Sequence, residues 1–184
     1  MCTKKCRLGN EKITPIDDIA NGECFGFSYS ATIVFKNNEN DILTLCSTVD
    51  MRETGFSPSK FCIFLKTTTN KNDMVLSSNF RKEQDAMFLD LIEIKDISLR
   101  GRGLGTIILS TWLTLLPEYS KLYNISFSKI EASVGSGNNF TPRFAKKLYR
   151  KFNNYKYTQT QRLRLNKSEL KHGRLVYMIE SVDY

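Results

Sequence analysis

The feature that most constrains the fold of this chain is a six-residue stretch, RGRGLG at 100–105, set between two strongly apolar runs. The run before it, AMFLDLIEIKDI at 86–97, is typical of a buried strand. The run after it, TIILSTWLTLLPEY, is apolar nearly all round, as in a helix packed against a sheet, and Pro117 should end or kink that helix. Residues 128–134 form another strand-like run. Two strands joined through a helix pair in parallel, so the sequence predicts one parallel pair here.

The remaining strand-like runs follow one another closely and predict antiparallel neighbours. They lie at 23–35, 41–49 and 60–69 before the glycine-rich stretch, and at 155–165 and 174–182 after it. TPRFAKKLYRKF at 141–152 predicts a helix with a Thr-Pro start. The predicted fold class is therefore α/β, of the α+β type, with a central mixed, mostly antiparallel sheet flanked by helices. The length suits a single domain, 1–184, whose N-terminal segment 1–22 can be irregular.

Charge and cysteine usage narrow the function classes. A formal net charge of +8 fits a nucleic acid, a membrane surface or an anionic small ligand as partner. The five cysteines are an odd number and no secretory signal opens the sequence, which together predict a reducing compartment, the cytoplasm. No run approaches the ~18–20 apolar residues of a membrane span, so no membrane is expected. Cys2 and Cys6 lack the Cys/His pair that would complete a zinc site, so no metal is expected.

The glycines between strand and helix predict an anion site. The first amides of a helix have no intrahelical acceptor, and the helix dipole favours negative charge there. Glycine lets a phosphate approach the backbone closely. The stretch fails the P-loop pattern because no lysine follows Gly105, and it fails the dinucleotide pattern because its glycines are spaced G-x-G-x-G. What remains is R-x-x-G-x-G, made by Arg100, Gly103 and Gly105.

This pattern in this context resembles motif A of the GCN5-related N-acetyltransferases, the GNAT superfamily. The resemblance covers residues 86–152 and includes a second helix with A-x-x-L-Y-x-x-F, formed by Ala145, Leu148, Tyr149 and Phe152. It implies a GNAT-like acyltransferase domain whose sheet splays between the strands at 86–97 and 128–134. The loop at 36–41 is too short for the helices that the family places between its first two strands. Either the strands at 23–35 and 41–49 are not the family's first two strands, or the acceptor side is built differently in this chain. In both cases the resemblance does not fix the acceptor.

The resemblance also implies a donor, acetyl-CoA, and residues that bind it. The turn would hold the pyrophosphate, mainly with main-chain amides; the residues are Arg100, Gly101, Arg102, Gly103, Leu104, Gly105 and Thr106. A backbone amide near Ile94, Lys95 and Asp96 would polarise the thioester. Asn138 or Asn139 could bind the pantetheine arm, although turn formation explains these asparagines equally well. The alternative for the whole turn is a plain strand-to-helix connection with solvated arginines.

Two catalytic roles are expected in an acyl transfer to an amine. Tyr149 matches the family's tyrosine that protonates the departing thiolate; its alternative is a core aromatic on an apolar helical face. Glu93 is the expected general base. The other carboxylates considered are Asp90 and Asp96, on the opposite strand face by alternation, and Glu131 on the next strand. His172, in a polar loop, is a weaker candidate still.

The expected function is thus an acetyl-CoA-dependent N-acetyltransferase acting on a primary amine of a small molecule, a protein or an aminoacyl-tRNA. Members of the family are often dimers, so a homodimer is one assembly that the resemblance allows. The alternative is a non-catalytic protein on the same fold that binds CoA or nucleic acid. In that case the basic clusters at 143–151 and 162–174 would carry nucleic-acid binding.

Overall fold

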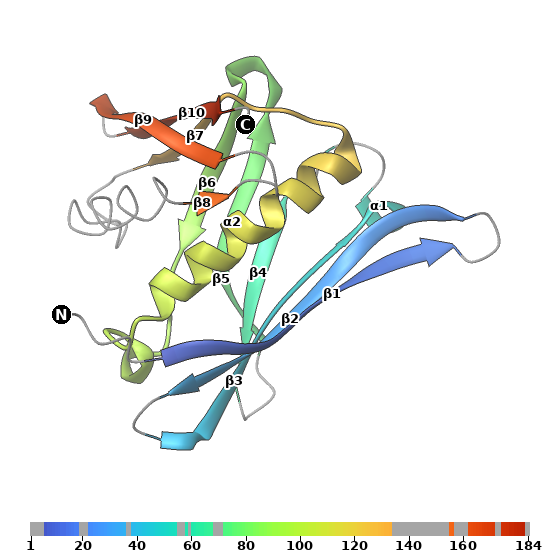
Figure 1. The fold of residues 1–184 in the computed structure, drawn as a ribbon. Helices are drawn as coiled ribbons and strands as arrows, with labels where there is room; N and C mark the ends of the chain where they lie inside the picture. Colours follow the sequence, from blue (N-terminus) through green and yellow to red (C-terminus); the bar gives the residue numbers. More distant parts are fainter. Residues whose placement is uncertain are drawn as a thin grey trace.

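The structure is a computed structural model that describes residues 6–18, 22–35, 38–54, 58, 60–67, 72–133, 155–156, 162–171 and 174–182. Within these ranges ten strands form one sheet, and the long helix α2 lies along it (Figure 1). The strands are β1 (Cys6–Asp18), β2 (Glu23–Phe35), β3 (Asn38–Asp50), β4 (Phe61–Lys66), β5 (Asn72–Arg81), β6 (Ala86–Ile92), β7 (Lys129–Ser133), β8 (Tyr155–Lys156), β9 (Arg162–Lys171) and β10 (Arg174–Val182). The helices are α1 (Met51–Thr54) and α2 (Leu104–Tyr123), with 3-10 turns at Lys82–Gln84 and Ile97–Leu99.

The order of strands in the sheet follows the chain from β1 to β7 and then runs β10, β9, β8. Strands β1 to β6 form an antiparallel meander, and β7 pairs antiparallel with β10. Strands β6 and β7 pair in parallel because α2 carries the chain from one end of β6 back to the start of β7. This mixed, mostly antiparallel sheet confirms the predicted fold class.

Helix α2 supplies much of the hydrophobic core. Its buried residues face the meander, and the indole N–H of Trp112 donates to Ser78 Oγ at 2.9 Å. The ring of Tyr119 stacks on Phe61 of β4, with centroids 5.1 Å apart and planes 6° apart. Of the two effects expected of Pro117, an end of the helix is excluded, since the helix continues to Tyr123. Tyr119 and Tyr123 are buried after the proline, and this packing offsets the ~3 kcal/mol that an interior proline costs.

The structure corrects the predicted strands in three places. The N-terminal segment 1–22, for which an irregular structure was expected, contains β1, and β1 pairs with β2 along nearly its whole length. A further strand, β5, was not predicted, although it contains the apolar residues Met74, Val75 and Leu76, and it pairs with both β4 and β6. The predicted strand at 155–165 covers two strands, β8 and the start of β9, which pair antiparallel with one another. The remaining predicted strands are present with shifted ends. The predicted helix at 141–152 lies outside the described residues.

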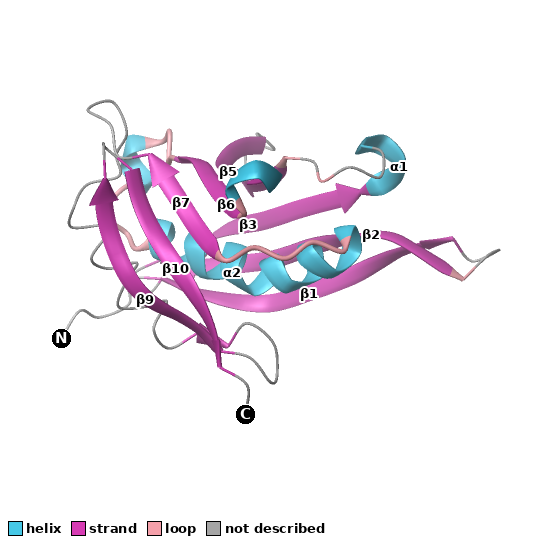
Figure 2. Cartoon of the chain, turned by 90° about the horizontal axis from the view of Figure 1, so that it is seen from above, coloured by secondary structure: helices cyan, strands magenta, loops and turns pink. Residues whose placement is uncertain are grey.

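Seen from above, α2 lies between β1 and β2 on one side and β7, β9 and β10 on the other (Figure 2). The hairpin of β1 and β2 runs past the sheet and projects beyond α1, while its opposite end lies near the start of α2 (Figures 1 and 2). The first residue of β1 therefore comes close to the glycine-rich turn. Among the described residues, no helix is both long enough and apolar enough to cross a membrane.

Candidate cofactor-binding site

The glycine-rich turn follows the point where β6 leaves its parallel partner. Residues 86–89 of β6 pair with residues 129–132 of β7, and β6 then extends to Ile92 while paired with β5. Asp90 is an extra residue in β6, because Ser78 is opposite Leu89 whereas Ser77 is opposite Leu91. Such a bulge bends a strand and sharpens its twist. The end of β6 is therefore directed along β5 and away from the β7 pairing.

The segment between β6 and α2 is held by local hydrogen bonds. The Asp96 carboxylate accepts from the backbone N–H of Ser98 at 2.9 Å and from its hydroxyl at 2.7 Å, and these bonds lower the pKa of Asp96. Arg100 folds back, so that its Nε donates to the carbonyl of Ile94 at 2.8 Å. The predicted thioester-side segment and the predicted phosphate turn are thus tied together by the arginine of R-x-x-G-x-G.

The two glycines before α2 adopt conformations that other residues rarely take. Gly101 has φ +71° and Gly103 has φ +94°. Gly103 is the N-cap of α2, and no side chain caps this helix end. The first helical hydrogen bonds run from Thr106 and Ile107 to the Gly103 carbonyl, at 3.2 and 3.4 Å. The amides of Leu104 and Gly105 come before these donors, so helix geometry gives them no carbonyl one turn earlier.

Among the described residues, no atom lies against the outer side of Gly101. A Cβ added at Gly101 would meet no atom within 4 Å. Gly101 and Gly103 are exposed, while Leu104 is buried under the turn and anchors the helix start to the core. A rigid, uncapped helix N-terminus with exposed glycines suits a phosphate, because backbone amides and the helix dipole both attract negative charge. The residues present therefore fit the pyrophosphate of the expected donor.

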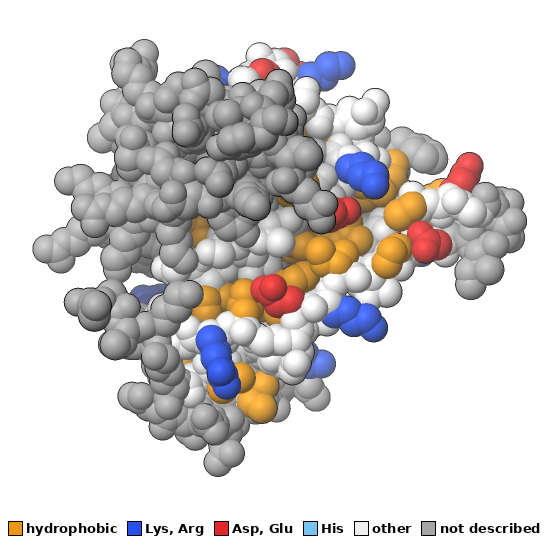
Figure 3. Space-filling model, in the orientation of Figure 1, with side chains coloured by type: hydrophobic (Ala, Val, Ile, Leu, Met, Phe, Trp, Pro, Cys, Tyr) orange, Lys and Arg blue, Asp and Glu red, His pale blue; other side chains and the backbone are white. Residues whose placement is uncertain are grey.

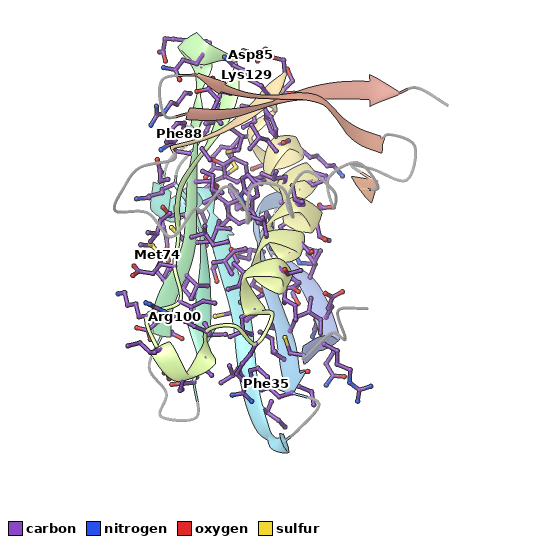
Figure 4. All side chains as sticks on the ribbon, turned by 90° about the vertical axis from the view of Figure 1, so that its left-hand side faces the viewer. Phe35, Met74, Asp85, Phe88, Arg100 and Lys129 are labelled. Carbon is purple, nitrogen blue, oxygen red and sulfur yellow. The ribbon has the colours of Figure 1, made fainter. Side chains whose placement is uncertain are left out.

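The arginine side chains of the turn differ in their surroundings. Arg100 is exposed and reaches back to Ile94, as described above. The guanidinium of Arg102 lies over the ring of Phe35, with its carbon 3.6 Å from the ring centroid. The carbonyl of Arg102 accepts from the thiol of Cys6 at 3.1 Å. Figure 4 shows Arg100 and Phe35 toward the same end of the molecule, with Asp85 and Lys129 at the other end.

Cys6 and Phe35 are the residues of this region that sequence reasoning missed. They are paired with one another in the register of β1 and β2, and both are buried. Burial raises the pKa of the Cys6 thiol, and Arg102 opposes that rise. The thiol is therefore protonated at neutral pH and able to donate. No local sequence signal links a cysteine to a turn some ninety residues later.

The carboxylates considered as bases have different partners. Asp90 accepts from Asn79 Nδ2 at 2.7 Å and lies 3.8 Å from an Arg81 nitrogen. Glu131 is buried and bonded to Lys129 Nζ at 2.8 Å, and Asp96 binds Ser98 as described. Glu93 is half-buried, and its amide donates to the Val75 carbonyl at 2.9 Å.

The orientation of Glu93 follows from its neighbours. Ile92 and Ile94 pack against the core that contains α2. Strand alternation then places Glu93 on the opposite face of the sheet. The other predicted residues, Tyr149, Asn138, Asn139 and His172, lie outside the described part of the chain. Within the described ranges, no cluster of His, Cys, Asp or Glu could hold a metal ion.

Comparisons with known proteins add little to this geometry. No protein-family model matches the sequence, and no curated protein matches it. One solved structure that it resembles is described as "Crystal structure of Nourseothricin acetyltransferase". The match has a TM-score of 0.38 and 11% sequence identity, and it covers 97% of this chain and 88% of that one. A TM-score at this level does not establish a common fold, so the proposal below starts from the turn itself.

Proposed function

We propose that this chain is an acetyl-CoA-dependent N-acetyltransferase that transfers an acetyl group to a primary amine. One observation carries the proposal: the uncapped N-terminus of α2, with exposed Gly101 and Gly103, follows β6 where that strand leaves its parallel partner. This arrangement would offer amides to a pyrophosphate, with the end of β6 close to them. The motif A resemblance of residues 86–105 supports the same reading.

On the donor side, residues 100–106 would bind the pyrophosphate. The amides of Leu104 and Gly105 are the best placed donors, because helix geometry leaves them without intrahelical acceptors. Arg100 would fix the geometry between the turn and the end of β6 through its bond to the Ile94 carbonyl. Ile94, Lys95 and Asp96 would provide the backbone that faces the thioester carbonyl. Acetyl-CoA itself supplies an activated acetyl group on a thiol leaving group.

On the acceptor side, the reaction needs two proton transfers. A nitrogen–carbon bond forms, the carbon–sulfur bond breaks, the amine loses a proton and the thiolate gains one. Glu93 is the proposed base, because Asp90, Asp96 and Glu131 each bind a neighbouring side chain. Tyr149 is the proposed acid, on the family resemblance. Asn138 or Asn139 would bind the pantetheine arm.

A thiol-release assay with acetyl-CoA and a panel of amines tests the proposal. The panel should include a polyamine, an amino sugar, a lysine peptide and an aminoacyl-tRNA. Glu93→Gln should lower turnover by about 10²–10⁴-fold and abolish the acidic limb of the pH–rate profile, as loss of a general base does. Glu83→Gln is the matched control, because Glu83 is exposed in the 3-10 turn at Lys82–Gln84. Equal activity of Glu93→Gln and wild type would remove Glu93 from the mechanism.

A second candidate function is CoA binding without catalysis. Three of the four carboxylates considered as bases already bind a neighbouring side chain, which favours a protein without a general base. Acetyl-CoA binding with no thiol release on any amine would support this candidate over the enzyme. The basic clusters at 143–151 and 162–174, which would carry nucleic-acid binding, lie outside the described side chains. On the face shown in Figure 3, the coloured Lys and Arg side chains are interspersed with Asp and Glu. The identity of the amine acceptor, the formation of a homodimer and a cytoplasmic location stay predictions.

A further inference from the structure

We infer that Cys6 is a positioning residue for the proposed donor site, so that the N-terminal strand β1 forms part of that site. This inference rests on the proposed function and deepens it. It starts from the Cys6 thiol, which donates to the carbonyl of Arg102 at 3.1 Å. Arg102 directly precedes Gly103, the residue that starts α2. A bond to this carbonyl therefore fixes the peptide that leads into the helix.

The contact is part of a larger support made by the β1–β2 hairpin. Cys6 and Phe35 are paired across the hairpin, and they are only 4% and 1% exposed. Phe35 carries the Arg102 guanidinium on its ring at 3.6 Å, a geometry that favours a cation over an aromatic face. One residue of the turn is thus held at both its carbonyl and its side chain by two neighbouring residues of the hairpin.

Close packing extends this support to the glycine itself. A Cβ on Gly103 would lie 3.5 Å from Cys6 Sγ, which is ordinary van der Waals contact. The thiol therefore lies directly against the residue whose φ of +94° sets the direction of the helix start. A phosphate site made of backbone amides depends on their orientation, since the donors have no side-chain freedom to adjust. Loss of the thiol should loosen the amides that follow.

The test compares four variants by acetyl-CoA titration, steady-state kinetics and amide hydrogen exchange of the 100–106 segment. Cys6→Ala and Cys6→Val both remove the donor, and valine fills the space that alanine leaves empty. Cys6→Ser keeps a donor of similar size. Cys24→Ala is the control, because Cys24 is exposed and pairs with Asp17 toward the other end of the hairpin.

We expect Cys6→Ala and Cys6→Val to raise the dissociation constant of acetyl-CoA about three- to tenfold, the loss typical of one hydrogen bond. The KM for acetyl-CoA should rise with kcat nearly unchanged, and exchange across 100–106 should accelerate without ligand. Cys6→Ser and Cys24→Ala should stay within about twofold of wild type. If Cys6→Val keeps the acetyl-CoA affinity and the amide exchange of wild type, the inference about Cys6 is wrong, while the proposed function is unaffected. Failure of the wild-type protein to bind acetyl-CoA would overturn the proposed function as well.

Discussion

Replacing Gly103 by alanine tests whether the backbone shape of the turn is needed for acetyl-CoA binding, separately from its effect on the stability of the fold. Gly103 has φ +94°, and a Cβ there would meet Cys6 Sγ at 3.5 Å, which is not a clash. The cost of Gly103→Ala is therefore mainly the left-handed backbone conformation. That conformation costs an L-residue about 1–2 kcal/mol. For a chain of this size we expect a fall in melting temperature of about 2–8 °C.

Gly22 provides a matched control for this cost. It has φ +66°, and a Cβ added there would meet nothing within 4 Å. It lies just before β2, near the end of the hairpin opposite the Cys6–Phe35 pair. Gly22→Ala should therefore reduce stability by a similar amount while leaving the turn unchanged.

The two variants should differ in acetyl-CoA binding. Relief of strain at Gly103 would rotate the amides of Leu104 and Gly105, which are the proposed phosphate donors. A hydrogen bond to a charged group contributes about 1.5–3 kcal/mol, so the dissociation constant should rise about tenfold to a hundredfold. Gly22→Ala should bind as wild type does. Equal affinity of both variants, with equal losses of stability, would refute the reasoning that this backbone shape forms the site.

Three further predictions address catalysis, the core and the cap before the turn. Tyr149→Phe should lower kcat while leaving acetyl-CoA affinity within about twofold; full activity across the pH range, measured by thiol release, would exclude the acid role. Trp112→Phe should cost about 2–4 kcal/mol in urea unfolding, because it leaves a cavity and removes the bond to Ser78. The double variant with Ser78→Ala should lose less than the sum of the single losses; strict additivity would mean that the bond contributes nothing. Because the folded pKa of Asp96 is lowered, its capping of Ser98 is present above the unfolded pKa of about 3.9 and is lost as pH falls through the folded value. The protection of amides 96–100, which is their exchange rate relative to the intrinsic rate at the same pH, should therefore fall on acidification in wild type, whereas Asp96→Ala should show this low protection at every pH.

Apolar runs bounded by clear breaks predicted the centre of the fold correctly. The run 86–97 contains the strand β6, which ends at Ile92, α2 starts at the glycines, and β7 pairs in parallel with β6. This passage was predictable because a helix between two strands of one sheet leaves little choice of pairing. The same passage also predicted an anion site, since glycines before a helix suit either a turn or an anion site.

The missed strands show where local signals fail. Strand β5 contains Ser77, Ser78 and Asn79, and the two serines are buried in the sheet. Ser78 is stabilised there by Trp112, a partner 34 residues away that no local pattern reveals. Strand β1 is a mostly exposed edge strand with few apolar positions, and Pro15 further weakens its signal. In both strands, pairing with neighbours outweighs the composition of the strand itself.

The contacts by which β1 and β2 hold the glycine-rich turn could not be predicted either, because the partners lie far apart in the sequence. Cys6 gave no sign of a role in a site, because its partner carbonyl belongs to Arg102. The sequence did not reveal the partners of the two arginines of RGRGLG, since Arg102 lies on Phe35 and Arg100 bonds to Ile94. Composition shows that charge is present, but only the folded backbone determines which charges are already engaged.

Calorimetric titration of the wild-type protein and of Gly103→Glu with acetyl-CoA tests the central claim most directly. Gly22→Glu is the control, because it adds the same charge at another exposed glycine of positive φ. The account predicts binding by wild type and by Gly22→Glu, and loss of binding in Gly103→Glu. Absence of wild-type binding, or undiminished binding by Gly103→Glu, would contradict the assignment of RGRGLG as a phosphate-binding turn.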